Sequence, residues 1–396
     1  MSSDGRILGD WLTSYTEFAE NSEPPPLFKI WSGVSAICAC LQRKCWTVWD
    51  RPVYPNMYIV LVGPSGCRKG TAMGPIMTLL VNLGIKMAAE AITREALIKV
   101  LKLSGVTDYE VTKDQTEPIM HASLTIFSQE LSVFLNRNNE ALLADLCDWY
   151  DCRDQWTYQT KNMGTDIIIG VWVNIFGATT PTFLQSSLPQ NAIGGGLTSR
   201  MVLVYGDKKH KSCPCPFLSP EEKELFKELF RDLEDINQLR GEFKMTKDFL
   251  NTYSNWYMKS EEKPRFKDIN FAGYNDRRAT HLRKLSMVMS ASRGDDMILT
   301  EMDFLNALTL LERTETRMPL ALSGRGLLEK SNVLEDIIRL LSSKGTLTTS
   351  DIASRFYRDI DLDELHRMVR TMEKAGICSI AQMGRETVLT WKGEVE

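Results

Sequence analysis

The stretch Met57–Thr71, MYIVLVGPSGCRKGT, constrains the fold more than any other part of the chain. Strand-forming residues run from Met57 to Val62 and end abruptly in a loop that contains glycine and lysine, and Ala72–Leu83 then has the composition of a helix. A strand, such a loop and a helix together cradle phosphate groups, because the loop N–H groups and the positive helix N-terminus face the anion. We therefore predict a nucleotide site here; the alternative is an ordinary Gly/Pro turn.

The predicted phosphate loop departs from the pattern G-x-x-x-x-G-K-[ST] at two positions. Arg68 stands where the second glycine is expected, and Gly70 stands where Ser or Thr is expected, with Thr71 one place later. Lys69 keeps its place and would reach the β- and γ-phosphates. Lysine followed by Gly-Thr also occurs in nucleoside monophosphate kinases, so we expect the loop to bind nucleotide. The predicted nucleotide-binding residues are Gly63, Pro64, Ser65, Gly66, Cys67, Arg68, Lys69, Gly70 and Thr71.

Composition limits the other classes of function. The net charge of −4 over 396 residues excludes a global basic field, so any nucleic-acid binding must use a local stripe. The nine cysteines are odd in number and lie mostly in apolar segments, which favours reduced thiols over a disulfide framework. The chain lacks a signal-like start and any apolar run of roughly 18 residues. We therefore expect a cytoplasmic protein that is not in a membrane.

A second predicted strand, His121–Phe127, ends in Ser128-Gln129-Glu130. An acidic residue at the end of a neighbouring strand is what an ATPase needs, because it orders Mg²⁺ or polarises the attacking water. The usual pattern is Asp followed by Glu, and Gln129 replaces the Asp here, so Glu130 would carry most of that work. The polar stretch Thr107–Pro118 before this strand is predicted to be a surface loop.

A third strand, Ile167–Gly177, is long and apolar. Polar residues at its tip, either Asn174 or Thr179 and Thr180, could sense the γ-phosphate. Before it, the strand-like runs Trp156–Thr160 and Thr165–Ile169 flank the turn Lys161-Asn162-Met163-Gly164, which predicts a hairpin.

A run of glycines precedes Arg200 and the strand Met201–Tyr205. Such a flexible run could deliver the guanidinium to the ATP of a neighbouring subunit, where it would neutralise charge. The alternative is a solvated arginine at the start of a strand.

Taken in order, GPSGCRKGTA, IFSQELSVF, LADLCDWYD, NIFGATTP and GGGLTSR resemble the superfamily 3-like replicative helicases of phages, plasmids and integrated mobile elements, which are often associated with primases. The likeness covers roughly residues 27 to 205 and continues more loosely to about residue 320. It implies an AAA+-like α/β ATPase with ATP and Mg²⁺ as cofactors, usually a hexameric ring around single-stranded DNA.

The resemblance also implies a role for particular residues. It places Lys69 and Thr71 on the phosphates and Mg²⁺, Glu130 as the catalytic acid near the metal, Asn174 as the sensor, Arg200 as the finger, and Lys161 with Asn162 at the pore-facing hairpin tip that contacts DNA. Arg68, Gly70 and Gln129 are departures, which leave open a weakened or regulated ATPase.

Four segments are predicted: an N-terminal helical segment 1–50, a P-loop ATPase core 51–210, a helical lid 211–325 and a winged-helix domain 326–396. The last rests on three predicted helices followed by a two-stranded wing. From Glu329 to Glu396 there are ten Lys and Arg against twelve Asp and Glu, and the candidate recognition helix begins with Asp361, Asp363 and Glu364. Because carboxylates repel phosphates, DNA contact and protein contact both stay open for this domain.

The leading hypothesis is an ATP-driven helicase or translocase that acts as a homo-oligomeric ring in the replication of a mobile element, with a primase or polymerase as a possible partner. The alternative is an ATP-binding initiator or loader that remodels DNA without processive unwinding. A small-molecule kinase and a non-catalytic assembly protein are the remaining hypotheses.

Overall fold

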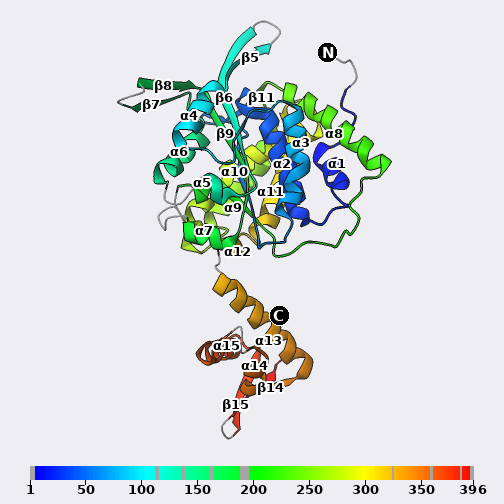
Figure 1. The fold of residues 1–396 in the computed structure, drawn as a ribbon, viewed down its shortest axis with the longest axis vertical. Helices are drawn as coiled ribbons and strands as arrows, with labels where there is room; N and C mark the ends of the chain where they lie inside the picture. The colour runs from blue at the N-terminus through cyan, green and yellow to red at the C-terminus, as the bar shows by residue number, and fades with distance from the viewer. Residues whose placement is uncertain are drawn as a thin grey trace. The chain divides into compact units, whose positions relative to one another are not determined.

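A parallel sheet forms the centre of the first part of the chain (Figure 1). Its strands follow the order β10-β3-β9-β6-β4, and every neighbouring pair in this order is parallel. The bounds are β10 Met201–Tyr205, β3 Tyr58–Val62, β9 Val171–Thr179, β6 Thr116–Ser128 and β4 Met87–Ala88. The expected α/β class is therefore confirmed, and the structure shows that its main sheet is parallel.

The computed structural model describes residues 5–111, 116–135, 139–160, 164–187, 196–322, 325–356, 360–383 and 386–392. The chain separates into two compact units, Met1–Leu322 and Ser323–Glu396. The first unit therefore contains the predicted segments 1–50 and 51–210 and nearly all of the predicted lid, 211–325.

The central strands are apolar because both faces of the sheet are covered. Every residue of β3 and of β9 is buried, as a continuous hydrophobic run predicts for a parallel sheet. The Tyr58 hydroxyl donates to the Leu146 carbonyl at 2.7 Å, and a Cβ placed on Gly177 would lie 3.1 Å from Leu131. Tyr58 and Gly177 share one face by register, so the helices α5 (Leu131–Leu135) and α6 (Glu140–Tyr150) cover that face.

The N-terminal helices are built into this unit. The helix α2 (Pro26–Leu41) is buried almost throughout and packs against α3 (Lys69–Asn82) and the sheet. The indole of Trp11 in α1 (Trp11–Phe18) donates to the Leu229 carbonyl at 2.9 Å. Segment 1–50 therefore shares one core with the sheet.

Helices α8 (Pro220–Gln238), α9 (Lys247–Glu262), α10 (Ala272–Arg293) and α11 (Glu301–Glu315) fill most of the segment predicted as a lid. Ser219 begins α8 with a capping box to Glu222, as the sequence Ser-Pro-Glu-Glu predicts. The shorter elements of the unit are β1 Cys45–Val48, β2 Pro52–Val53, α4 Arg94–Leu103, α7 Pro181–Ser187, β11 Gly241–Glu242, β12 Lys244–Met245, β13 Ile298–Leu299, α12 Pro319–Leu322, and the 3₁₀ turns Gln42–Lys44, Thr198–Arg200 and Ile269–Phe271.

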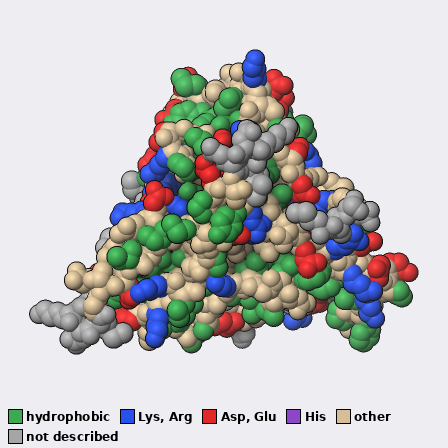
Figure 2. Space-filling model, turned by 90° about the horizontal axis from the view of Figure 1, so that it is seen from above, with side chains coloured by type: hydrophobic (Ala, Val, Ile, Leu, Met, Phe, Trp, Pro, Cys, Tyr) green, Lys and Arg blue, Asp and Glu red, His purple; other side chains and the backbone are tan. Residues whose placement is uncertain are grey.

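Two antiparallel hairpins extend from the sheet (Figure 1). The hairpin of β7 (Gln155–Thr160) and β8 (Gly164–Ile169) lies between β6 and β9 in the sequence, as predicted. The predicted loop Thr107–Pro118 is wrong, because β5 (Gly105–Val111) pairs there with the first residues of β6. Figure 2 looks down on this end and shows hydrophobic, basic and acidic side chains mixed on the surface.

The second unit contains α13 (Arg325–Lys344), α14 (Thr349–Phe356) and α15 (Leu362–Lys374) with a three-stranded antiparallel sheet of order β14-β16-β15. The strands are β14 Thr346–Thr348, β15 Cys378–Met383 and β16 Glu386–Trp391, and β14 is the addition to the predicted elements. Its core includes Ile337, Leu341, Leu347, Ile352, Leu365, Met372, Cys378 and Leu389. Among the residues described for either unit, no helix is long and apolar enough to cross a membrane.

Candidate functional site

The carboxyl ends of β3, β9 and β6 meet at one edge of the sheet. Val62 at the end of β3 lies beside Thr179 at the end of β9, and Gly177 lies beside Ser128 at the end of β6. The connection after β3 runs toward β4 at one side of the sheet, and the connection after the neighbouring strand β9 runs to β10 at the other side. The direction of winding therefore reverses between β3 and β9. Ligands of open α/β sheets bind at the carboxyl edge where this reversal occurs.

The loop that follows β3 is anchored on both sides. The Gly63 N–H donates to the Thr179 carbonyl at 3.2 Å, and the Gly206 N–H donates to the Val62 carbonyl at 2.9 Å. A Cβ on Gly63 would overlap the main-chain oxygen of Gly206 and lie 2.7 Å from the Cys67 sulfur. Glycine at position 63 is therefore required by the close approach of three chain segments.

The loop backbone has positive φ angles at Gly66 and at Arg68, the position where the pattern has glycine. Gly66 has φ of 87°, and Arg68, which replaces the expected glycine, has φ of 66° and ψ of 34°. A left-handed conformation costs a non-glycine residue about 1 kcal/mol. The Arg68 Nε atom forms an ion pair with Glu23 at 2.5 Å, which helps to hold this residue in place.

The Lys69 ammonium curls back over the loop. Its Nζ atom donates to the carbonyls of Gly63 at 2.7 Å and Pro64 at 3.0 Å. Ser65, Gly66, Gly70 and Thr71 are exposed. The first N–H groups of α3 have no intrahelical acceptor, so an anion can reach both these groups and the ammonium.

The end of β6 lies against the start of α3. A Cβ on Gly70 would lie 3.3 Å from Oε1 of Gln129, and Glu130 follows directly. Glu130 is exposed and accepts a hydrogen bond from the Ser132 hydroxyl at 2.8 Å. The predicted phosphate loop and the predicted acidic strand end therefore share one edge of the sheet.

The magnesium prediction fits this edge poorly. Mg²⁺ bound to a nucleotide is usually held by carboxylate or hydroxyl oxygens together with the phosphates. The two positions that face each other carry glycine and a neutral amide, Gly70 and Gln129. In the described ranges, no group of three or more His, Cys, Asp or Glu side chains is arranged to hold a metal. The predicted ligands Thr71 and Glu130 are both exposed at this edge.

The end of β9 contributes a buried hydroxyl. Thr179 is 1% exposed, and its Oγ1 atom makes no hydrogen bond within the described residues. The Ser128 hydroxyl at the neighbouring strand end is equally buried and unpaired. A buried hydroxyl without a protein partner is explained by a bound water or by a functional role, and the Thr125 hydroxyl of β6 is in the same position.

Asn174, predicted as the sensor, lies elsewhere. Its Oδ1 atom accepts a hydrogen bond from the Met57 N–H at 3.0 Å, at the amino end of β3. The stretch from Asn174 to Thr179 is about 16 Å long in an extended strand. The structure therefore corrects this placement: Thr179, which the sequence also offered, lies beside the predicted phosphate loop, and Asn174 does not.

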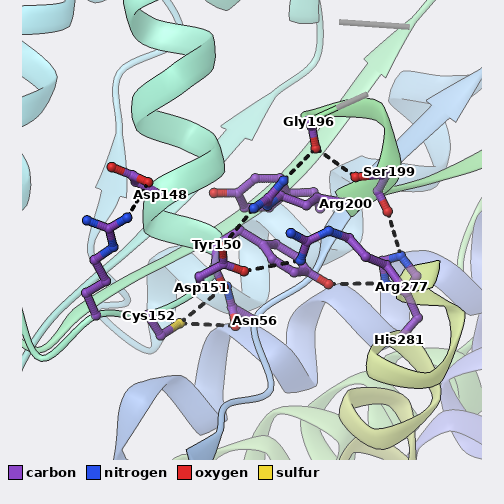
Figure 3. A network of polar contacts seen from close by, with 12 residues as sticks. Asn56, Asp148, Tyr150, Asp151, Cys152, Gly196, Ser199, Arg200, Arg277 and His281 are labelled. Atoms are coloured by element: carbon purple, nitrogen blue, oxygen red, sulfur yellow. Dashed lines mark hydrogen bonds and ion pairs between the residues drawn. The ribbon is translucent and has the colours of Figure 1, made fainter. Parts of the chain in front are cut away.

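Arg200 lies at the amino edge of the sheet, because Met201 pairs with Tyr58. The side chain is 11% exposed. Its Nη1 atom donates to the Gly196 carbonyl at 2.8 Å, and its Nη2 atom donates to Asp151 at 2.7 Å (Figure 3). Arg277 donates to the other oxygen of Asp151 at 3.2 Å. The predicted finger is thus bound within its own chain, to an aspartate that sequence reasoning did not single out.

The same network holds two buried basic groups. His281 accepts from the Tyr150 hydroxyl at 3.2 Å and donates to the Ser199 carbonyl at 3.1 Å, and burial lowers its pKa to about 3. Lys284 donates to the Asn56 carbonyl at 2.9 Å, and burial lowers the pKa of its ammonium to about 8. The sequence could have pointed to Asp151 through its place in the segment LADLCDWYD. No sequence pattern pointed to Asn56.

Lys161 and Asn162, the predicted nucleic-acid contacts, lie outside the described residues, between the ends of β7 and β8. All nine cysteines are described, and none of them forms a disulfide.

The chain matches no protein-family model, and a search of curated proteins finds no similar sequence.

Proposed function

We propose that the first unit binds a nucleoside triphosphate at Met57–Thr71 and hydrolyses it to drive movement on nucleic acid, as an ATP-dependent helicase or translocase. One observation carries the proposal. The lysine loop, the acidic end of β6 and the buried Thr179 lie at a single edge of a parallel sheet, on three neighbouring strands. This is the edge where α/β proteins place phosphates, and it supplies a cation, a carboxylate and a hydroxyl.

Within this proposal, Lys69 would leave the carbonyls of Gly63 and Pro64 and bind the β- and γ-phosphates. Glu130 would polarise the attacking water, and Thr179 would orient that water or the γ-phosphate. Preorganised groups of this kind stabilise the charge that develops on the transferred phosphoryl group.

Replacement of Lys69 tests the proposal. Lys69→Ala should reduce ATP turnover at least about 100-fold, by analogy with the loss of one charge-stabilising donor. Phosphate release should be measured with and without single-stranded DNA. Lys99→Ala, which removes an exposed lysine from α4, is the matched control and should turn over normally. Normal turnover by a folded Lys69→Ala variant would refute the phosphate-loop assignment.

The nucleic-acid part of the proposal rests on the β7–β8 hairpin, which lies between the strands β6 and β9 in the sequence. In a ring, its tip with Lys161 and Asn162 would face the channel and contact phosphates without reading sequence. Lys161→Ala should weaken single-strand binding uniformly, flatten its salt dependence and abolish unwinding while basal hydrolysis survives. Unwinding at the normal rate would move the nucleic-acid role to another element.

A second candidate is an ATP-binding initiator or loader that remodels DNA without processive unwinding. It is favoured by the internal pairing of Arg200 with Asp151 and by the neutral pair Gly70 and Gln129, which both weaken the case for fast turnover. A strand-displacement assay with and without ATP separates the two candidates, since only the first requires displacement of more than a local segment.

For the second unit we propose a winged-helix fold used for protein contact. Asp361 caps α15 by accepting from the Glu364 N–H at 2.8 Å, so the first turn of the candidate recognition helix concentrates Asp361, Asp363 and Glu364. Carboxylates at this position repel a phosphate backbone. Full-length protein with Arg367→Ala and Arg370→Ala should bind DNA as well as the parent; a clear loss of affinity would favour DNA contact instead.

A further inference from the structure

The start of α3 faces a neutral amide at the end of β6. Gln129 points its Oε1 atom toward Gly70, at 3.3 Å from where a Cβ would stand. Gln129 is exposed, and within the described part of the chain no residue hydrogen-bonds its side chain. In a loop of the usual pattern these two positions would carry a hydroxyl and a carboxylate; here both have changed, and the two positions are neighbours in space.

We infer that this loop binds the phosphates of a nucleoside triphosphate without a divalent cation, with the Gln129 amide donating directly to a phosphate oxygen. The inference rests on the proposed nucleotide site. A carboxylate beside phosphate repels it unless a cation lies between them. An amide carries no charge and has two N–H donors, so it can bond a phosphate oxygen directly.

The protein also supplies positive charge of its own at this loop. Lys69 and Arg68 are adjacent, and the Arg68 side chain is 46% exposed although its Nε atom pairs with Glu23. The N-terminus of α3 adds the partial positive charge of its free N–H groups. Lys69 and the helix end therefore supply positive charge against the phosphates and against the carboxylate of Glu130 at the same edge. Arg68 adds to this charge only in part, because Glu23 already pairs with its guanidinium.

The test compares binding of a fluorescent ATP analogue to the full-length protein in EDTA and in Mg²⁺ at equal ionic strength. The dissociation constants should agree within about threefold. Gln129→Glu keeps the size of the side chain and restores the charge, so its affinity should fall about tenfold or more in EDTA and recover in Mg²⁺. Gln238→Glu makes the same charge change at the exposed end of α8 and should bind like the parent in both buffers.

The outcomes separate the inference from the proposed function. Binding by the parent in Mg²⁺ alone overturns the inference and leaves the nucleotide site standing. Binding in neither buffer overturns the nucleotide site itself, as does equal binding by a folded Lys69→Ala variant. Equal binding by the parent in both buffers, with no effect of Gln129→Glu, overturns the role of Gln129. If Gln129→Glu does not fold, the dissociation constants of the parent in EDTA and in Mg²⁺ still show whether the loop binds ATP without a divalent cation.

Discussion

Arg200 and Asp151 form an ion pair within one chain, with 2.7 Å between the guanidinium Nη2 and the carboxylate Oδ2. Burial opposes the charge of Asp151, but the hydrogen bond from Arg200 and the charges of Arg200 and Arg277 outweigh it and lower the pKa of that carboxyl. The pair joins the segment after α6 to the start of β10, so its first role is to hold these two segments together.

Asp151→Asn should therefore destabilise the first unit by about 2 kcal/mol, because it leaves a largely buried guanidinium without its counter-charge. Thermal denaturation measures the loss. Asp148→Asn is the matched control: Asp148 pairs with Arg153 at the surface, with side chains 42% and 59% exposed, and such pairs contribute little. Equal effects of the two substitutions would contradict a structural role for the Arg200 pair.

The buried imidazole of His281 makes stability depend on pH. Its pKa is about 3 in the folded chain against an ordinary value of 6.5, so between these values the unfolded chain binds a proton that the folded chain does not. Stability should then be complete above pH 6.5 and fall as the pH decreases toward 3. Urea denaturation at pH 7.5 and pH 5.5, both values chosen as roughly one unit on either side of the ordinary pKa, measures the change.

His281→Gln keeps a donor for the Ser199 carbonyl but cannot take up the proton, so its loss of stability between those two pH values should be smaller than that of the parent. His210→Gln, at an exposed histidine of the same unit, should leave the parent's pH dependence unchanged. A parent-like pH dependence in His281→Gln would assign the effect to other groups.

The hydroxyl of Thr179 can be removed at nearly constant volume. Thr179→Val should lower ATP turnover about 10-fold or more if the hydroxyl orients the water or the γ-phosphate. Its folding stability should be unchanged or higher, because the buried Oγ1 has no described partner to lose. Thr125→Val is a close control: this hydroxyl on β6 is also buried and unpaired, but it lies at the level of Asn174. Similar turnover in both variants would argue against a role for Thr179.

Two glycines of the strand–loop–helix segment should respond oppositely to alanine. Gly63→Ala should abolish nucleotide binding, because the added Cβ would overlap the main chain of Gly206 and move the loop. Gly74→Ala should stabilise the protein by about 0.5–1 kcal/mol, since Gly74 is helical and a Cβ there meets nothing within 4 Å. Nucleotide titration and thermal denaturation of both variants check this; normal binding by Gly63→Ala would show that the loop adapts.

The strands β3 and β10, the second half of β6 and most of β9 were predictable because each is an apolar run that ends in a loop signal. The two-residue strand β4 was not predicted, and the predicted strand Ile167–Gly177 is divided at Gly170, where β8 ends and β9 begins. The pairing of β5 with β6 was not predictable, since the stretch 107–118 is polar in sequence and its described residues are mostly exposed. A strand without a buried face leaves no periodic pattern.

The candidate site was predictable at the loops that follow β3 and β6, and not at β9. Lys69 follows β3 after a short loop and Glu130 comes two residues after β6, so both are expected at the carboxyl edge of the sheet. Asn174 lies within a strand that is buried at every position. Burial alone does not show how far a residue lies from the carboxyl edge of the sheet. Arg200 looked free because its partner Asp151 is distant in the sequence and joins it only through the fold.

Glu23 connects the predicted phosphate loop to a distant part of the chain. Besides Arg68, it accepts from the Lys209 ammonium at 2.9 Å and from the Cys213 N–H at 3.1 Å. The conformation of the loop therefore depends on the segment between α1 and α2, which contains Glu23, and on the segment that follows β10. In related sequences, residues 23 and 68 should therefore change together. Where glycine occupies the position of Arg68, an acidic residue at the position of Glu23 should be less frequent.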